Sequence, residues 1–207
     1  MYHVFDAIHS TQDLKVLSKG ELAELAAEIR SLMLTRLSAT GGHVGSNLGM
    51  IEATIALHYV FNSPQDKIVF DVSHQCYTHK LLTGRNIGGF TNPAESEHDL
   101  FSVGHASTAV SLACGLAKAR NLKEEHYNVI AVVGDGALRG GEAFEGLNCA
   151  ATLGSNLIIL VNDNDWSIAE NHGGLYENLR LLRETDGAAP CNYFRAMGLQ
   201  SINSSIY

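Results

Sequence analysis

The apolar positions of this chain follow helical and strand patterns in turn. Apolar residues recur at helical spacing from Leu22 to Leu37, and Ser18 and Glu21 before them form a capping-box pattern, so a helix is predicted over 19–38. Helices are also predicted over about 48–61, 108–120 and 141–153, and apolar runs predict strands over 67–72, 128–133 and 156–161. This alternation favours the α/β class, with a doubly wound, mostly parallel sheet flanked by helices.

Two segments lie outside this alternation. Residues 84–104 hold many turn-forming residues and few periodic apolar ones, which predicts a long loop of the kind that often carries function. From about residue 170 the pattern weakens, and 175–207 is expected to be an irregular tail. A chain of 207 residues is long enough for one well-buried domain, so 1–207 is expected to be a single domain.

Composition narrows the classes of partner. The 22 acidic residues outnumber the 14 Lys and Arg, and this net charge of −8 argues against nucleic acid, which needs a basic face. The four cysteines lie far apart without a C-x-x-C pair, so neither a disulfide framework nor a zinc site is expected. No signal-peptide pattern and no run of membrane-spanning length is visible. We therefore expect a cytoplasmic protein without a membrane partner.

Polar residues follow two of the predicted strands at the point where each ends. Gly134-Asp135-Gly136 follows one apolar run, and Asn162-Asp163-Asn164 follows the next. Ligands gather at the carboxyl ends of strands in open α/β sheets, and carboxylate and amide oxygens suit Mg²⁺. Each motif alone also fits a plain turn or a helix cap. Together they predict a magnesium-bound diphosphate held by Asp135 and Asn164.

Loop histidines suggest further chemistry. His43, His74 and His105 lie beside glycines, a strand end or a helix start, which favours a site that handles protons or phosphate oxygens over solvated loop residues. His98 also lies in a loop. A dinucleotide-binding loop is rejected, because Arg139 stands where the pattern G-x-G-x-x-G needs its last glycine.

Six motifs, in this order, resemble the N-terminal domain of the 1-deoxy-D-xylulose-5-phosphate synthases, a family of the transketolase superfamily. They are Thr40-Gly41-Gly42-His43, Asp71-Val72-Ser73-His74-Gln75, Glu95-Ser96-Glu97-His98-Asp99, Val103-Gly104-His105-Ala106-Ser107-Thr108, the run from Gly134 to Asn148, and Asn162-Asp163-Asn164. The similarity extends over about residues 5–175. It implies the diphosphate-binding domain of that family.

The resemblance implies thiamine diphosphate and Mg²⁺ as cofactors. The metal would be held by Asp135, Asn164 and the backbone carbonyl of Trp166. The cofactor would contact His74, Gly104, His105, Ala106, Gly136, Ala137 and Asn164, with Ala106 where the family usually has Ser. His43 and His74 would assist proton transfers as pyruvate is decarboxylated and the two-carbon unit adds to glyceraldehyde 3-phosphate.

The chain departs from the family pattern at three further positions. Ser73 replaces a glycine, Thr78 a proline, and Pro93 an arginine expected to meet anionic substrate. A transketolase-like exchange of ketol units between sugar phosphates is therefore a second hypothesis. A non-catalytic protein that binds Mg²⁺ and diphosphate is a third.

The family continues into pyrimidine-binding and C-terminal domains, which we expect to be absent from this chain. The pyrimidine-binding domain supplies a glutamate that activates the cofactor and an aromatic residue that stacks on it. We therefore expect the chain alone to be inactive. It would act as a homodimer, or as a hetero-oligomer with a subunit that carries the missing domain.

Overall fold

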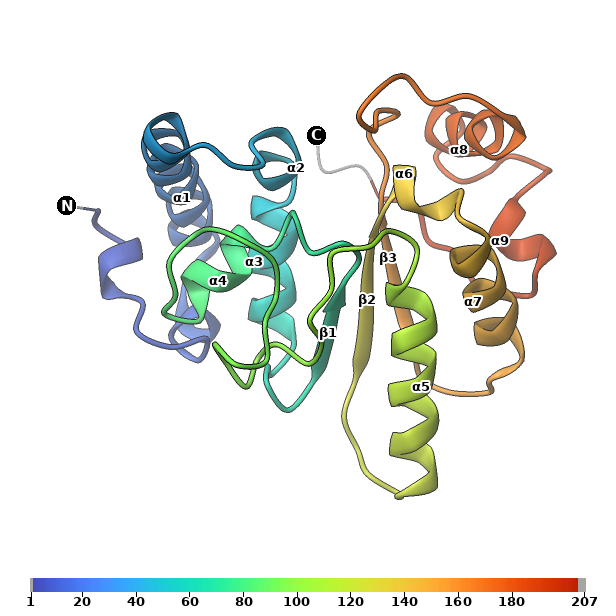
Figure 1. Ribbon diagram of the computed structural model, residues 1–207, viewed down its shortest axis with the longest axis horizontal. Helices are drawn as coiled ribbons and strands as arrows, with labels where there is room; N and C mark the ends of the chain where they lie inside the picture. The colour runs from blue at the N-terminus through green and yellow to red at the C-terminus, as the bar shows by residue number, and fades with distance from the viewer. Residues whose placement is uncertain (1, 205–207) are drawn as a thin grey trace. The chain divides into compact units, whose positions relative to one another are not determined.

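The computed structural model describes residues 2–204 (Figure 1). The chain divides into two compact units, with the boundary between Gly104 and His105. The first unit contains the short 3₁₀ helices η1 (Phe5–Ala7) and η2 (Asp13–Val16), the helices α1 (Lys19–Thr40), α2 (Gly45–Leu48), α3 (Ile51–Val60) and α4 (Tyr77–Leu82), and the strand β1 (Lys67–Phe70). The second contains α5 (Ala109–Leu122), β2 (Val129–Gly134), α6 (Asp135–Leu138), α7 (Gly141–Thr152), β3 (Ile158–Asn162), α8 (Gly174–Glu184) and α9 (Tyr193–Ala196).

Helix α1 dominates the first unit and begins where the sequence predicts. The side chain of Ser18 accepts a hydrogen bond from the N–H of Glu21, and the Glu21 carboxylate accepts one from the N–H of Ser18, so the predicted capping box is confirmed. Its core face carries Leu25, Ile29 and Met33, which are completely buried. This face packs against α3.

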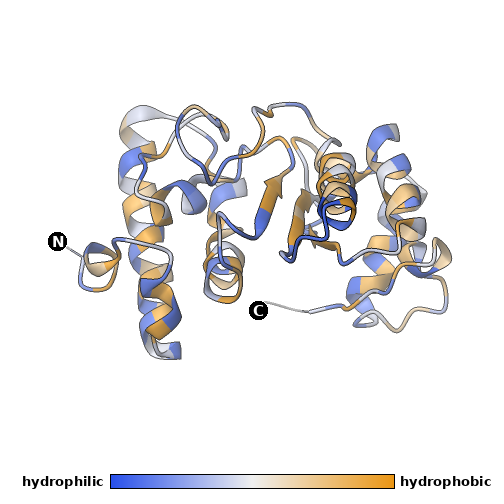
Figure 2. Cartoon of the chain, turned by 90° about the horizontal axis from the view of Figure 1, so that it is seen from below, coloured by the Kyte–Doolittle hydropathy of each residue, from blue (hydrophilic) through white to orange (hydrophobic). Residues whose placement is uncertain are grey.

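The second unit is built on two parallel strands. β2 pairs with β3 in a register that sets Ile130 opposite Ile158 and Gly134 opposite Asn162. Helix α5 packs against β2 and α7. The strand arrows are mostly orange in Figure 2, and this apolar character matches the buried run of β2. The α/β class with a parallel sheet flanked by helices is confirmed.

Several boundaries differ from the sequence predictions. The helix expected over about 48–61 is α3, which begins at Ile51, and the one-turn helix α2 precedes it. Helix α4 was not predicted because its six residues are too few to show a helical repeat of apolar positions. Residues 84–104 contain neither helix nor strand, as expected.

The expectation of an irregular segment over 175–207 is wrong for its first part. Helix α8 begins at Gly174 and buries Tyr176, Leu179 and Leu182 at helical spacing, and α9 follows it. The last residues, 205–207, lie outside the part of the chain that the structure describes.

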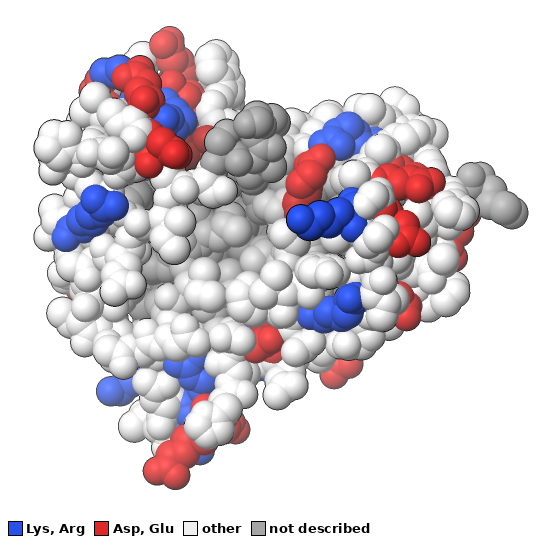
Figure 3. Space-filling view, turned by 180° about the vertical axis from the view of Figure 1, so that it is seen from behind, with Lys and Arg blue, Asp and Glu red and all other residues white. Residues whose placement is uncertain are grey.

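The described surface carries mixed charge. Figure 3 shows acidic and basic side chains interspersed over the face that it draws. Among the described residues, the structure contains no helix long and apolar enough to span a membrane.

Candidate functional site

The two polar strand ends of the second unit lie next to each other. Because Gly134 is opposite Asn162 in the parallel register, Asp135 and Asp163 follow at neighbouring positions. The Asp135 carboxyl is buried, and it accepts a hydrogen bond of 2.7 Å from Asn171 Nδ2. Burial and the negative charge of Asp163 raise the pKa of Asp135 to about 6. The carboxylate therefore lies where its own charge is poorly compensated.

Arg183 forms ion pairs with the two aspartates that flank Asn164. Arg183 of α8 donates to Asp163 Oδ2, and its second terminal nitrogen lies 2.9 Å from Asp165 Oδ2. Asn164 is exposed between them, and its Oδ1 accepts the N–H of Trp166 at 3.1 Å. The carboxamide oxygen of Asn164 keeps a second lone pair for a further partner.

A second loop is fastened to the segment after Asp135. Ser107 Oγ donates to the carbonyl of Ala137 at 2.7 Å, which joins the segment of His105 and Ala106 to the segment of Gly136 and Ala137. A Cβ on Gly136 would lie 2.7 Å from Ser167 Cβ, so a side chain there would displace the neighbouring loop. His105 and Ala106 remain exposed.

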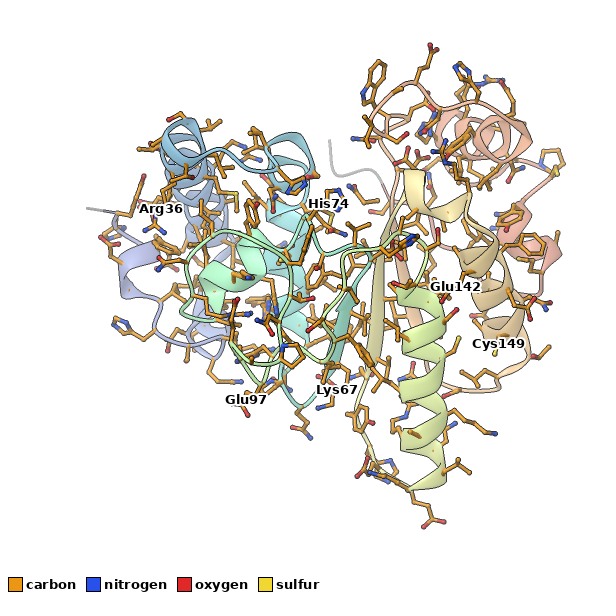
Figure 4. The ribbon with its side chains drawn as sticks, viewed as in Figure 1. Arg36, Lys67, His74, Glu97, Glu142 and Cys149 are labelled. Carbon is orange, nitrogen blue, oxygen red and sulfur yellow. The ribbon has the colours of Figure 1, made fainter. Side chains whose placement is uncertain are left out.

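The first unit holds the histidine pair. The rings of His43 and His74 lie 5.3 Å apart at 71°, and Phe90 lies 6.0 Å from His43 (Figure 4 labels His74). Burial, assisted by nearby His43, lowers the pKa of His74, so its imidazole is neutral at neutral pH. His74 Nδ1 is buried without a hydrogen-bond partner among the described residues.

The loop over 84–104 is anchored by buried charges. His79 Nε2 contacts Asp99 Oδ1 at 3.0 Å, and Arg85 donates to both oxygens of Asp99. These bonds hold the pKa of Asp99 well below its usual range, although burial opposes the shift. Lys80 Nζ donates to the carbonyl of Gly88 and to Glu95, each at 2.9 Å. The loop is therefore fastened to α4.

Each predicted site residue belongs to one of the two compact units. His43, His74 and Gly104 belong to the first unit, and His105, Ala106, Asp135, Gly136, Ala137, Asn164 and Trp166 belong to the second. In the first unit, the structure brings His43 and His74 together. In the second unit, it brings the residues at the strand ends and the loop residues together. His98 is a structural residue instead, because its Nδ1 bonds Ser63 Oγ at 2.9 Å.

Sequence patterns missed three residues that organise these sets. Asn171 bonds Asp135, Arg183 bonds the aspartates beside Asn164, and Asn47 bonds the backbone of both His43 and His74. No motif marks them, because each meets its partners only after folding.

The described residues include no cluster of three or more His, Cys, Asp and Glu side chains that could hold a metal ion. The donor set at the strand ends is of another kind, since it offers one carboxylate, one carboxamide and backbone carbonyls. Hard oxygen donors of this kind fit Mg²⁺ better than zinc.

Parallel strands that are followed by Asp135 and by the segment around Asn164, with glycines beside them, are consistent with an α/β domain of the transketolase type. Residues 5–201 match the sequence profile of the family described as 1-deoxy-D-xylulose-5-phosphate synthase. The chain belongs to this family.

Curated relatives agree with this assignment. The 1-deoxy-D-xylulose-5-phosphate synthase of Desulforudis audaxviator is 51% identical over 191 residues, which are 87% of this chain and 30% of the relative. That of Listeria welshimeri is 50% identical over 84% of this chain and 29% of the relative. That of Parabacteroides distasonis is 46% identical over 97% of this chain and 34% of the relative. The chain spans about a third of the length of these relatives.

Proposed function

We propose that this chain is the part of a 1-deoxy-D-xylulose-5-phosphate synthase that binds Mg²⁺ and the diphosphate of thiamine diphosphate, with 1–207 acting as the diphosphate-binding domain. The observation that carries the proposal is the register of β2 and β3, which sets Gly134 opposite Asn162. This register brings Asp135 beside the segment that carries Asn164. If the two motifs lay far apart in the fold, they would indicate only two unrelated turns.

In this proposal Asp135, Asn164 and the backbone carbonyl of Trp166 hold the metal. The raised pKa of Asp135 supports it, because a buried carboxylate beside Asp163 gains from a divalent cation that offsets its negative charge. Asn171 orients the Asp135 carboxylate. Because Arg183 pairs with Asp163 and Asp165, Asn164 is the side chain of its segment that remains available for the metal.

The remaining proposed contacts lie on short backbone segments. The diphosphate and thiazolium contacts are His74, Gly104, His105, Ala106, Gly136, Ala137 and Asn164. When bound, thiamine diphosphate supplies the electron sink for decarboxylation of a 2-oxo acid. His74 is neutral at neutral pH, so a ring nitrogen of its imidazole accepts a proton and returns it. His43 serves as its partner in these transfers.

The proposed substrates are those that the family resemblance implies. Pyruvate is the donor and glyceraldehyde 3-phosphate the acceptor, and 84–104 forms the active-site loop. A second candidate, the exchange of ketol units between sugar phosphates, is favoured by one observation. Pro93 is exposed in the loop, and the run Thr91-Asn92-Pro93-Ala94 provides no basic side chain for an anionic group.

The partner is a segment that completes the cofactor site, since the curated relatives are about three times as long as the matched region. We propose a homodimer, or a hetero-oligomer with a subunit that carries a pyrimidine-binding domain, in the cytoplasm. The chain alone is inactive in this proposal. If the chain lacks activity even in combination with this partner, it has a non-catalytic role.

Thermal unfolding tests cofactor binding. Thiamine diphosphate with Mg²⁺ should raise the melting temperature of the chain, because a ligand of the folded state stabilises it. Asp135→Asn should abolish this rise, whereas Asp186→Asn, an exposed change of the same kind, should retain it. An unchanged melting temperature at millimolar cofactor and Mg²⁺ would contradict the proposal.

Pyruvate-dependent release of CO₂ tests the reaction. We expect release only when the chain is combined with the segment that completes the site. Activity of the lone chain would overturn the requirement for a partner. Sugar-phosphate exchange without pyruvate consumption would select the transketolase-like candidate instead.

A further inference from the structure

Asn47 joins the two segments that carry the histidine pair. It lies in the one-turn helix α2, and its side chain is completely buried. Its Nδ2 donates to the carbonyl of His43 and to the carbonyl of His74, both at 2.7 Å. Its Oδ1 accepts the backbone N–H of Tyr77 at 2.9 Å. One carboxamide therefore holds three backbone groups, which belong to two segments of the chain.

The three partners determine how the Asn47 amide is oriented. Two of them are carbonyls, which only accept hydrogen bonds, and the third is an N–H, which only donates. A flipped amide would set its oxygen against a carbonyl oxygen and its nitrogen against an N–H. A carboxylate of the same size would lose both donors and leave buried carbonyls without partners, which is costly.

Neighbouring residues restrict the same segment. Gly42 has φ +136°, and a Cβ there would lie 2.8 Å from Leu37 Cδ2 and 3.1 Å from Tyr77 Oη. The N–H of His43 donates to Tyr77 Oη at 3.5 Å. The backbone at His43 thus lies directly against Tyr77, whose own N–H is held by Asn47. These contacts restrict the backbone positions from which the two imidazole side chains extend.

We propose that Asn47 is a positioning residue for the His43–His74 pair: it sets the ring separation of 5.3 Å by holding the backbone of both histidines. The catalytic consequence rests on the proposed function. Because proton transfer requires close alignment of the groups involved, a misplacement of about 1 Å costs up to about 100-fold in rate. Asn47 itself touches neither substrate nor cofactor in this proposal.

Two variants separate the hydrogen bonds of Asn47, and a third variant serves as their control. Asn47→Asp keeps the size and the acceptor for Tyr77 N–H but removes both donors to the histidine carbonyls. Asn47→Leu removes all three bonds. Asn86→Asp is the matched control, since Asn86 is exposed in the same unit and undergoes the same chemical change.

Nuclear magnetic resonance of the whole chain gives a readout that needs no cofactor. Ring protons of His43 and His74 should show a nuclear Overhauser effect in the unaltered chain and in Asn86→Asp, and lose it in Asn47→Asp. The pKa of His74 should move toward its ordinary value in Asn47→Leu, which adds no charge near the ring, because the ring leaves its buried place beside His43. Folded variants with an unchanged effect in Asn47→Asp and an unchanged His74 titration in Asn47→Leu would overturn the proposal.

A second measurement uses the unaltered chain, in case Asn47→Asp does not fold. Scalar couplings across hydrogen bonds should connect Asn47 Nδ2 to the carbonyl carbons of His43 and His74. Absence of both couplings while the chain is folded would overturn the proposal.

Kinetics then distinguish positioning from a purely structural role. In the completed enzyme, Asn47→Asp should lower kcat about 10-fold or more with Mg²⁺ affinity unchanged, because the metal donors lie on other segments. An unchanged kcat in a variant that has lost the ring contact would overturn the positioning role. If the chain binds no thiamine diphosphate, the proposed function fails, whereas the resonance result still decides the role of Asn47.

Discussion

His79 donates a hydrogen bond of 3.0 Å from Nε2 to Asp99 Oδ1, and both side chains are completely buried. Asp99 is ionised and accepts only, so His79 Nε2 carries the proton and His79 Nδ1 is the acceptor. Nδ1 lies 2.8 Å from His58 Nε2, which must therefore donate. The chain of bonds from His58 to Asp99 thus has one direction, and it joins α3 and α4 to the loop over 84–104.

Asp99→Asn should lower the free energy of unfolding by about 3 kcal/mol, because it leaves the Arg85 guanidinium beside a neutral group in a mostly buried place. Chemical denaturation followed by circular dichroism measures this loss. Glu97→Gln, an exposed change in the same loop, should have little effect. Equal stabilities of the two variants would contradict the anchoring role of Asp99.

Stability should fall as the pH is lowered from about 7 toward 5, by up to about 1.4 kcal/mol per pH unit for each histidine involved. Burial lowers the pKa of His58 and of His79 in the folded state. Below the ordinary histidine pKa, the unfolded chain binds protons that the folded chain does not, so acid favours unfolding. Above it both states are neutral and the contribution is constant.

Denaturation midpoints across this range test the pH dependence. His58→Gln should flatten the slope below the ordinary histidine pKa, whereas a change at exposed His126 should not. A slope that is unchanged in His58→Gln would assign the pH dependence to other groups.

Lys80→Met should loosen the loop over 84–104. The Lys80 side chain is almost completely buried, and its Nζ holds the carbonyl of Gly88 together with Glu95 (Figure 4 shows Glu97 in the same loop). Amide hydrogen exchange in the loop should speed up about 10-fold, since local opening costs less without these bonds. Lys118→Met on α5 is the matched control, and equal exchange in both variants would argue against this tether.

If Asp135 holds Mg²⁺ as proposed, Asn171→Ala should weaken Mg²⁺ binding about 10-fold, because partners that orient a ligand are nearly as important as the ligand itself. Asn171 Nδ2 donates to Asp135 at 2.7 Å and its Oδ1 accepts from Ser167 at 2.7 Å. Titration calorimetry with Mg²⁺ and thiamine diphosphate measures the change. Asn148→Ala on the exposed face of α7 should bind as the unaltered chain does.

Thiol reagents should label two of the four cysteines in the folded chain. Cys149 and Cys191 are exposed, whereas Cys76 and Cys114 are buried. Burial raises the pKa of Cys76 to about 12 and that of Cys114 to about 11, so their reactive thiolate forms are scarce at neutral pH. Mass spectrometry after brief labelling should detect two modifications, and all four after unfolding. Rapid native labelling of Cys76 would contradict its burial.

Local patterns predicted the elements whose signals are complete within a short stretch. The capping box at Ser18 fixes the start of α1, and the β-branched run before Gly134 marks β2. The strand ends around Asp135 and Asn164 could be read as neighbours because parallel strands share an edge. Helix α8 was missed because its start at Gly174 resembles a turn, although its buried residues have helical spacing.

The supporting residues of the site could not be predicted, because their signals are not local. Asn171 lies 36 residues from Asp135, and Asn47 lies 27 residues from His74. An asparagine in a short helix or a loop is typical of many caps and turns, so its type alone indicates no partner. Only the folded backbone brings the donors and carbonyls together.

The carboxamide of Asn47 has no proton to gain or lose in the physiological range. Its hold on the carbonyls of His43 and His74 is therefore the same whether the imidazoles are charged or neutral. The two rings can change charge while their attachment points stay still. In the proposed function, the scaffold of the pair is thus decoupled from the proton transfers of its rings, and the pair can return to its starting geometry after each transfer.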